Sequence, residues 1–98
     1  MRQMGDFLST QRLDIWLFRA RLTKSRADAA RLIGEGGVRV LREGQSRRLL
    51  KPSAEIAPGD TITFPACGQV RALHVLALGK RRGPPAEARR LYREEAGS

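Results

Sequence analysis

Basic and hydroxyl side chains stand together at residues 23–26, where the sequence reads TKSR. Ser25 is a residue type that caps helix N-termini, and Asp28 completes an S-x-x-D pattern of the capping-box kind. The first N–H groups of a helix that begins after Ser25 point outward at the positive end of its dipole. Lys24 and Arg26 flank that end, so the stretch predicts a phosphate site. A capped helix on a solvated basic surface is the alternative interpretation.

More cations precede this stretch. Arg12 and Arg19 are seven residues apart and share one edge of a helical pattern, and Arg21 comes just before the connecting segment. A phosphodiester backbone needs several cations close together, which a helical hairpin with a basic junction supplies. We therefore expect the helix-hairpin edge to hold phosphates through Arg12, Arg19, Lys24 and Arg26.

Residues for catalysis or metal binding are scarce. One Cys and one His cannot make a zinc site. Cys67 and His74 are roughly 20 Å apart if the strand between them is extended, too far for a nucleophile and its base. The glycines of GEGG (34–37) follow a helix and precede a strand, the reverse of a dinucleotide-binding loop. We expect no enzyme activity, no catalytic residue, no metal and no cofactor.

The bulk composition points to a polyanionic partner. The chain has 98 residues, enough for one small domain, with 19 Lys and Arg against 10 Asp and Glu, a net charge of +9. Such a balance favours nucleic acid. No apolar run approaches the ~20 residues of a membrane span, and the lone Cys67 fits a reducing cytoplasm. We expect a cytoplasmic monomer that binds neither membrane nor a small-molecule substrate.

Two helices precede a set of strands in the pattern of the sequence. Leu13, Trp16, Leu17 and Ala20 fall at i, i+3, i+4 and i+7, which predicts a helix from Arg12 with one apolar stripe. On this helix Asp14 and Arg21 are expected on the back. Phe18 also points away from the stripe, either to pack on another element or to stack on a base. The second helix is expected to begin after Ser25 and to end at GEGG, with Ala29, Leu32 and Ile33 on its inner face.

Strand signals follow the helices. VRVL (38–41), SRRLL (46–50), TITF (61–64) and QVRALHVLAL (69–78) predict strands, with a turn at Gly44 and a loop over 51–60. His74 is expected to be an ordinary residue at the sheet surface. Pro84-Pro85 predicts a short helix in which Ala88, Leu91 and Tyr92 form a patch. The basic run Lys80-Arg81-Arg82 precedes it.

The ordered motifs resemble a known family. RLDIWLFRARLTKSRADAARLIGEGGVRV followed by KPSAEIAPGDTITF resembles the RNA-binding domain family named after ribosomal protein S4. The tryptophan of RLDIWLF and the GKRRGPPAEARRLYREE segment are similar to the ribosome-associated heat-shock protein 15 family. The resemblance implies an α+β, S4-like (αL motif) fold of two packed helices against a small antiparallel sheet, plus a short C-terminal helix. From the resemblance, together with the absence of periodicity in the first residues, we expect an arm (1–11), an S4-type RNA-binding domain (12–78) and a basic linker with a C-terminal helix (79–98).

The same resemblance implies a function. It implies binding of structured RNA, especially ribosomal RNA, and for the heat-shock family binding of the free large ribosomal subunit with a tRNA-attached nascent chain, in rescue of stalled translation. By position, Arg12, Lys24, Ser25 and Arg26 stand where the family contacts the RNA backbone. Arg31 and Arg39 are weaker matches, and we expect Lys80, Arg81 and Arg82 to make a second, less specific contact.

Departures from the family pattern leave alternatives open. The segment VLREGQSRRLLKPS is about three residues longer than the family turn, so the first hairpin must bulge or extend, and its Arg42, Arg47 and Arg48 are additional candidate contacts. The rival interpretations are a duplex-DNA-binding protein, an RNA-targeting module that acts with a separate RNA-modifying enzyme, and a protein–protein adaptor.

Overall fold

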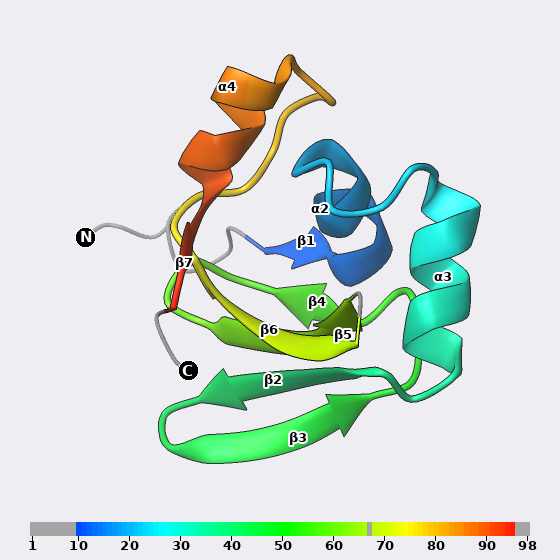
Figure 1. Ribbon diagram of the computed structural model, residues 1–98. Helices are drawn as coiled ribbons and strands as arrows, with labels where there is room; N and C mark the ends of the chain where they lie inside the picture. Colours follow the sequence, from blue (N-terminus) through cyan, green and yellow to red (C-terminus); the bar gives the residue numbers. More distant parts are fainter. Residues whose placement is uncertain (1–9, 67, 96–98) are drawn as a thin grey trace.

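Two helices cover one face of a five-stranded antiparallel sheet in the computed structural model, which describes residues 10–66 and 68–95 (Figure 1). The strand order is β3-β2-β5-β6-β7, and a separate two-stranded pair joins β1 to β4. The predicted α+β architecture is confirmed. The elements are β1 (Gln11–Arg12), α2 (Leu13–Arg19), α3 (Arg26–Gly34), β2 (Val38–Arg42), β3 (Gln45–Leu49), β4 (Glu55–Ile56), β5 (Thr61–Ala66), β6 (Gln69–Val75), α4 (Pro85–Ala88), the 3₁₀ helix η1 (Arg89–Leu91) and β7 (Tyr92–Glu94).

The predicted apolar stripe of α2 forms the centre of the core. Leu13, Trp16 and Leu17 are fully buried, and Ala20 is nearly so. They pack with the inner residues of α3 and with one face of the sheet. The core also contains Ala29, Ile33, Val38, Val40, Ile56, Ile62, Phe64, Leu73 and Val75. Burial of this apolar area is the main force that fixes both helices on the sheet.

The predicted ends of α3 are confirmed. Ser25 is in extended conformation and its Oγ accepts the N–H of Asp28 at 3.0 Å. The Asp28 carboxylate lies 3.3 Å from Arg31, so one half of the capping box is used. At the other end Gly36 has φ of +79°, the left-handed conformation that ends helices and that glycine adopts without a Cβ penalty.

The long first hairpin is regular. β2 and β3 pair over five positions, from Val38 opposite Leu49 to Arg42 opposite Gln45. Glu43 and Gly44 form the turn with φ of 52° and 81°, the positive values of a two-residue type I′ connection. The additional residues therefore extend the hairpin without a bulge.

The C-terminal part of the chain corrects two predictions. β6 ends at Val75 instead of residue 78, and the chain then leaves the sheet. The helix predicted after Pro84 is one turn of α4 followed by η1, and Tyr92 belongs to β7 instead of a helical patch. β7 pairs antiparallel with β6, with Tyr92 opposite Val75, because the free edge of β6 offers unpaired backbone groups. His74 lies on β6, as predicted, with its Nδ1 3.3 Å from the Thr61 hydroxyl.

The predicted N-terminal arm lies outside the described residues except at its end. Gln11 and Arg12 form β1, opposite Ile56 and Glu55 of β4, so the sheet pair begins before the helix. α2 begins at Leu13, one residue later than predicted. Among the described residues, no helix has the length and apolar character to cross a membrane.

Candidate nucleic-acid interface

A buried carboxylate organises two of the predicted phosphate-binding arginines. Asp14, 4% exposed, accepts hydrogen bonds from Arg12 Nε at 3.1 Å and Nη2 at 3.0 Å. Its second oxygen is 3.6 Å from Nη2 of Arg26, at the start of α3. One carboxylate thus fixes two guanidiniums that come from different elements. Both side chains remain about half exposed, so their outer N–H groups face solvent.

Backbone contacts hold the start of α2 in this place. Arg12 is the N-cap residue and has no side-chain cap hydrogen bond. The loop before β4 supplies acceptors instead, because the carbonyls of Ala54 and Pro52 accept from Leu13 N at 2.7 Å and Asp14 N at 3.3 Å. The KPSA loop therefore supports the RLD stretch from 40 residues away in the sequence.

Sequence reasoning missed the role of Asp14, which it placed on the back of α2, away from the apolar stripe. That assignment took account of the apolar stripe alone, whereas the back of α2 is covered where α3 begins. The available signal was an acidic residue in the first turn of a helix that follows an arginine. A carboxylate in that place can accept the free N–H groups of the turn. Asp14 does so with the N–H of Ile15 at 2.8 Å.

The remaining candidates on this side lie around the N-terminus of α3. Lys24 and Arg31 are exposed, and among the described residues Lys24 has no acidic partner within ion-pair distance. Ser25 caps the helix as described above. We call Arg12, Lys24, Ser25, Arg26 and Arg31 together the α3 edge.

A second set of predicted residues contacts the C-terminal part of the chain instead. Residues 76–83, here named the strap, run from β6 across α2 to α4 (Figure 1). Trp16 Nε1 donates to the Ala77 carbonyl at 2.9 Å, and Arg19 Nη1 donates to the Gly79 carbonyl at 2.6 Å. A Cβ on Gly79 would stand 2.9 Å from that of Arg19, so the close crossing requires glycine. Arg19 is therefore engaged within the fold.

The three residues of the basic run 80–82 make different contacts. Arg82 donates to the carbonyls of Phe18 at 3.1 Å and Thr23 at 3.3 Å, and its guanidinium lies 4.7 Å from the Phe18 ring centroid. Phe18 therefore packs against Arg82, the first of its two predicted roles. Arg81 is paired with Glu87 at 2.7 Å. Lys80 is exposed, and within residues 10–66 and 68–95 it has no ion-pair partner.

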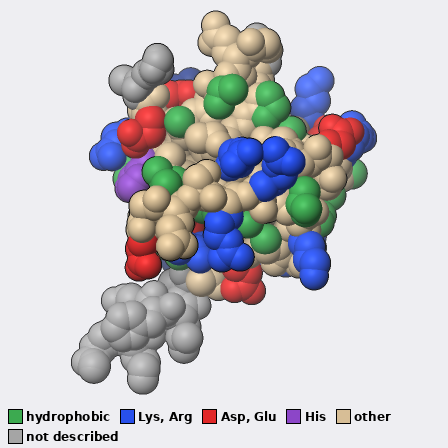
Figure 2. Space-filling model, turned by 90° about the horizontal axis from the view of Figure 1, so that it is seen from below, with side chains coloured by type: hydrophobic (Ala, Val, Ile, Leu, Met, Phe, Trp, Pro, Cys, Tyr) green, Lys and Arg blue, Asp and Glu red, His purple; other side chains and the backbone are tan. Residues whose placement is uncertain are grey.

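The outer face of the sheet carries a different basic cluster. Arg39 on β2 is exposed and lies directly opposite Arg48 on β3, on the side away from the helices. Figure 2 shows this side of the molecule, where Lys and Arg side chains mix with apolar ones and acidic side chains lie nearer the margins. Arg39 is thus separated from the α3 edge by the thickness of the sheet.

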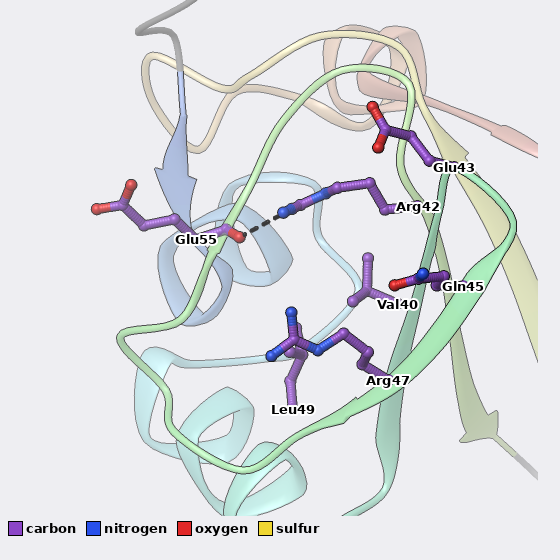
Figure 3. A pocket seen from close by; sticks show the side chains of 7 residues that line it. All are labelled: Val40, Arg42, Glu43, Gln45, Arg47, Leu49 and Glu55. Atoms are coloured by element: carbon purple, nitrogen blue, oxygen red, sulfur yellow. Dashed lines mark hydrogen bonds between the residues drawn. The ribbon is translucent and has the colours of Figure 1, made fainter.

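Two arginines of the long hairpin, Arg42 and Arg47, lie around one hollow, whereas Arg48 is opposite Arg39 on the outer face. A hollow of about 340 Å³ lies between the hairpin and Glu55 and is lined by Arg42 and Arg47 (Figure 3). Arg42 forms a two-pronged pair with the buried Asp60, at 2.8 and 2.7 Å, and also donates to the Glu55 carbonyl. The hydrogen bond to Asp60 raises the pKa of Arg42, with a further Coulombic contribution from the same carboxylate. Arg47 is the cation of this hollow that has no acidic partner in the described part of the chain.

A surface ion pair joins the last two strands. Arg71 on β6 contacts Glu94 on β7 at 2.7 and 2.9 Å. The hydrogen bond from Arg71 lowers the pKa of Glu94, and the same bond raises the pKa of Arg71. The Glu94 side chain is 51% exposed, so solvent screens much of this interaction.

This pair predicts a small pH-dependent contribution to stability. A carboxyl group whose pKa is lowered by folding stabilises the folded state above its unfolded pKa of about 4.3 and loses that contribution as the pH falls through the lower folded value. Glu94→Gln should therefore reduce the free energy of unfolding by less than about 1 kcal/mol at pH 7. Urea unfolding between pH 2 and 7 should show this difference vanish at the acidic end. A difference that persists at pH 2 would contradict it.

Three comparisons with known proteins identify the relatives of this chain. The S4 domain family matches residues 11–40. Heat shock protein 15 of Escherichia coli strain K12 is 40% identical over 87 residues, which cover 89% of this chain and 62% of the relative, and the O157:H7 protein matches to the same extent. The chain thus spans about three fifths of the length of these curated relatives.

One solved structure is matched over a larger share of its length than the curated relatives are. Heat Shock Protein 15 of Vibrio cholerae, described as trimeric, is 32% identical with a TM-score of 0.76. The superposition covers 90% of this chain and 84% of the Vibrio chain. Fold, motif order and sequence identity agree, and the chain therefore belongs to the heat shock protein 15 family.

Proposed function

We propose that this chain is a non-enzymatic RNA-binding protein that holds the phosphate backbone of structured RNA along the α3 edge. The observation that carries the proposal is the junction at Asp14, where Arg12 and Arg26 are fixed side by side with their outer N–H groups in solvent. Guanidinium groups match phosphate oxygens in geometry as well as charge. Holding them before RNA arrives lowers the entropy lost on binding.

The surroundings of this junction add to its attraction for phosphate. Lys24 supplies another cation, and the N-terminus of the nine-residue helix α3 directs its first N–H groups outward. Arg31 extends the cations along the exposed side of α3. Backbone contacts of this kind position RNA and carry no sequence information directly.

We further propose that the RNA is ribosomal and that the protein acts on the free large ribosomal subunit with a tRNA-attached nascent chain. Family membership and the net charge of +9 support this assignment. Sucrose-gradient sedimentation of lysate tests it, because we expect co-migration with free large subunits. Co-migration with small subunits alone would contradict the subunit assignment and leave the RNA proposal standing. The expectation of a monomer stays a prediction, tested by sedimentation velocity.

Arg26→Ala is the direct test of the α3 edge. If four to six phosphates are neutralised, log Kobs should fall with log salt at a slope of roughly −3 to −5, and loss of one contact should reduce that slope by about 0.7–0.9. The loss of affinity should be the same for RNAs of different sequence. Filter binding over a salt series, with several structured RNAs, measures both.

A matched variant separates the site from overall charge. Arg93→Ala removes an exposed, ion-paired arginine from β7, at the opposite edge of the sheet from α3 (Figure 1). We expect this variant to retain nearly the full slope. Equal losses in both variants, or a loss confined to one RNA sequence, would argue against a backbone site at the α3 edge. Competition with duplex DNA at fixed salt distinguishes the DNA-binding alternative.

A further inference from the structure

A basic pocket lies between the end of α2 and the C-terminal helical turn. Its volume is about 320 Å³, and it is lined by the three arginines Arg21, Arg82 and Arg89 together with Pro85, Ala88 and Tyr92. The lining contains no carboxylate. The acidic residue of α4, Glu87, is bound to Arg81 instead.

Two of the three guanidiniums are held in place by backbone carbonyls. Arg21 Nε donates to the Gly83 carbonyl at 2.5 Å, and Arg82 uses its Nε and one Nη on Phe18 and Thr23. A guanidinium has five N–H donors, so each keeps further donors available. A carbonyl acceptor orients an arginine without neutralising it. Arg89 is exposed and, within the described residues, has no acidic partner.

The backbone at Arg21 gives a second, independent observation. The N–H groups of Arg21 and Leu22 donate back to the carbonyls of Phe18 at 3.1 Å and Leu17 at 2.9 Å, the hydrogen-bond pattern of a Schellman motif. Arg21 occupies its left-handed position with φ of 61°, where glycine is the favoured residue. An arginine there destabilises the helix end relative to glycine, whereas its side chain closes the pocket.

We propose that this pocket binds a phosphate group. Three positive charges around one cavity repel one another, and an anion with several oxygens relieves that repulsion while it accepts the unused N–H groups. The cavity is larger than one phosphate, and Pro85, Ala88 and Tyr92 give it an apolar wall on which an attached sugar or base can rest. The group belongs either to a free nucleotide or to an RNA strand. This site is separate from the α3 edge and does not depend on the function proposed for that edge.

The test uses Arg89→Gln in the full chain. Arg89 makes no ion pair in the described structure, so its replacement should leave the fold intact. Adenosine monophosphate and inorganic phosphate serve as probes, titrated at fixed ionic strength and followed by calorimetry and by the NMR shifts of the arginine Nε–H groups. We expect Arg89→Gln to lower the affinity for at least one of these probes, or for a short single-stranded RNA, about tenfold.

Arg90→Gln is the matched control. Arg90 is the next residue of η1, is exposed, and does not line the pocket, while its replacement removes the same charge. The affinity of Arg90→Gln for each probe should stay within about twofold of that of the unchanged protein. Equal losses in the two variants, or Nε–H shifts that spread evenly over arginines outside the pocket, would overturn the proposal.

A further arm identifies the source of the phosphate. A short single-stranded RNA is tested with a 5′-phosphate and with a 5′-hydroxyl. Dependence on Arg89 for the mononucleotide indicates a free nucleotide, dependence only for the phosphorylated RNA indicates a strand end, and dependence for both RNAs indicates an internal phosphate. If binding of the two RNAs, of the mononucleotide and of inorganic phosphate is in every case independent of Arg89, the proposal is wrong. Because Arg26→Ala reports on the α3 edge, failure of one site is distinguishable from failure of the other.

Discussion

Replacing Trp16 with alanine is expected to lower the free energy of unfolding by about 3–5 kcal/mol. Trp16 is fully buried at the centre of the core, its ring makes an edge contact with Tyr92 at 6.3 Å between centroids, and its indole N–H donates to the Ala77 carbonyl. The substitution removes all three contributions and leaves a cavity. A typical domain has only about 5–15 kcal/mol to lose. Urea unfolding followed by far-ultraviolet circular dichroism measures the change, because the variant has no tryptophan fluorescence.

Two companion variants separate the causes of that loss. Trp16→Phe keeps an aromatic ring and leaves the Ala77 carbonyl without its donor, which should cost about 1–3 kcal/mol. Val70→Ala changes a side chain that is 73% exposed, and its effect should stay within about 0.5 kcal/mol. If Trp16→Ala were no worse than Val70→Ala, the packing of α2 against the strap would be wrong.

Asp14→Asn is expected to weaken RNA binding although it makes the protein more positive. The amide has one acceptor oxygen and no charge, so Arg12 and Arg26 lose the partner that fixes them. Stability should fall by about 2 kcal/mol, below the 3–5 kcal/mol of a fully buried pair because both arginines are half exposed. Urea unfolding and filter binding at one salt concentration measure the two effects.

Glu35→Gln provides the charge-matched comparison. Glu35 is exposed at the end of α3, and its replacement raises the net charge by the same amount. A surface that attracts RNA by charge alone predicts slightly tighter binding in both variants. Positioning by Asp14 predicts tighter binding for Glu35→Gln and weaker binding for Asp14→Asn. Tighter binding in both would show that the buried carboxylate contributes only to stability.

The parts of the fold predicted from the sequence are those decided by local physics. The stripe of α2 follows from residue spacing. The cap follows from the side-chain oxygen of Ser25, and the turn follows from the positive φ that Gly44 adopts easily. Each of these signals lies within a few residues of the structure that it specifies. The order of motifs then indicated how these pieces assemble.

The parts that could not be predicted depend on elements distant in the sequence. Tyr92 fits a helical patch in spacing, yet it joins a strand because β6 has an open edge. Arg19, Arg21 and Arg82 were assigned to RNA from their charge, whereas each also donates to a backbone carbonyl about 60 residues away. A hydrogen bond of that kind leaves no local pattern.

The sequence predicted which residues belong to the candidate site, but it did not predict the carboxylate that holds two of them together. Arg12, Lys24 and Arg26 were grouped from their positions, and the structure places Arg12 and Arg26 around one carboxylate. Whether RNA occupies this edge remains the proposal that the Arg26 and Asp14 variants test. Arg39, on the outer face of the sheet, would have to meet a different part of any bound RNA.

The strap also has a consequence for the order of folding. Its hydrogen bonds to β1, α2 and the loop after α2 join residues 59–68 positions apart, in a chain of 98. The helix hairpin closes only short loops and can form early, but Trp16 and Arg19 find their acceptors only after loops of some sixty residues have closed. The N-terminal half is synthesised first, but its hydrogen bonds to the strap can form only after the strap has been synthesised. Arg19 and Arg21 gain the backbone carbonyls that orient them only after residues 79 and 83 have been synthesised.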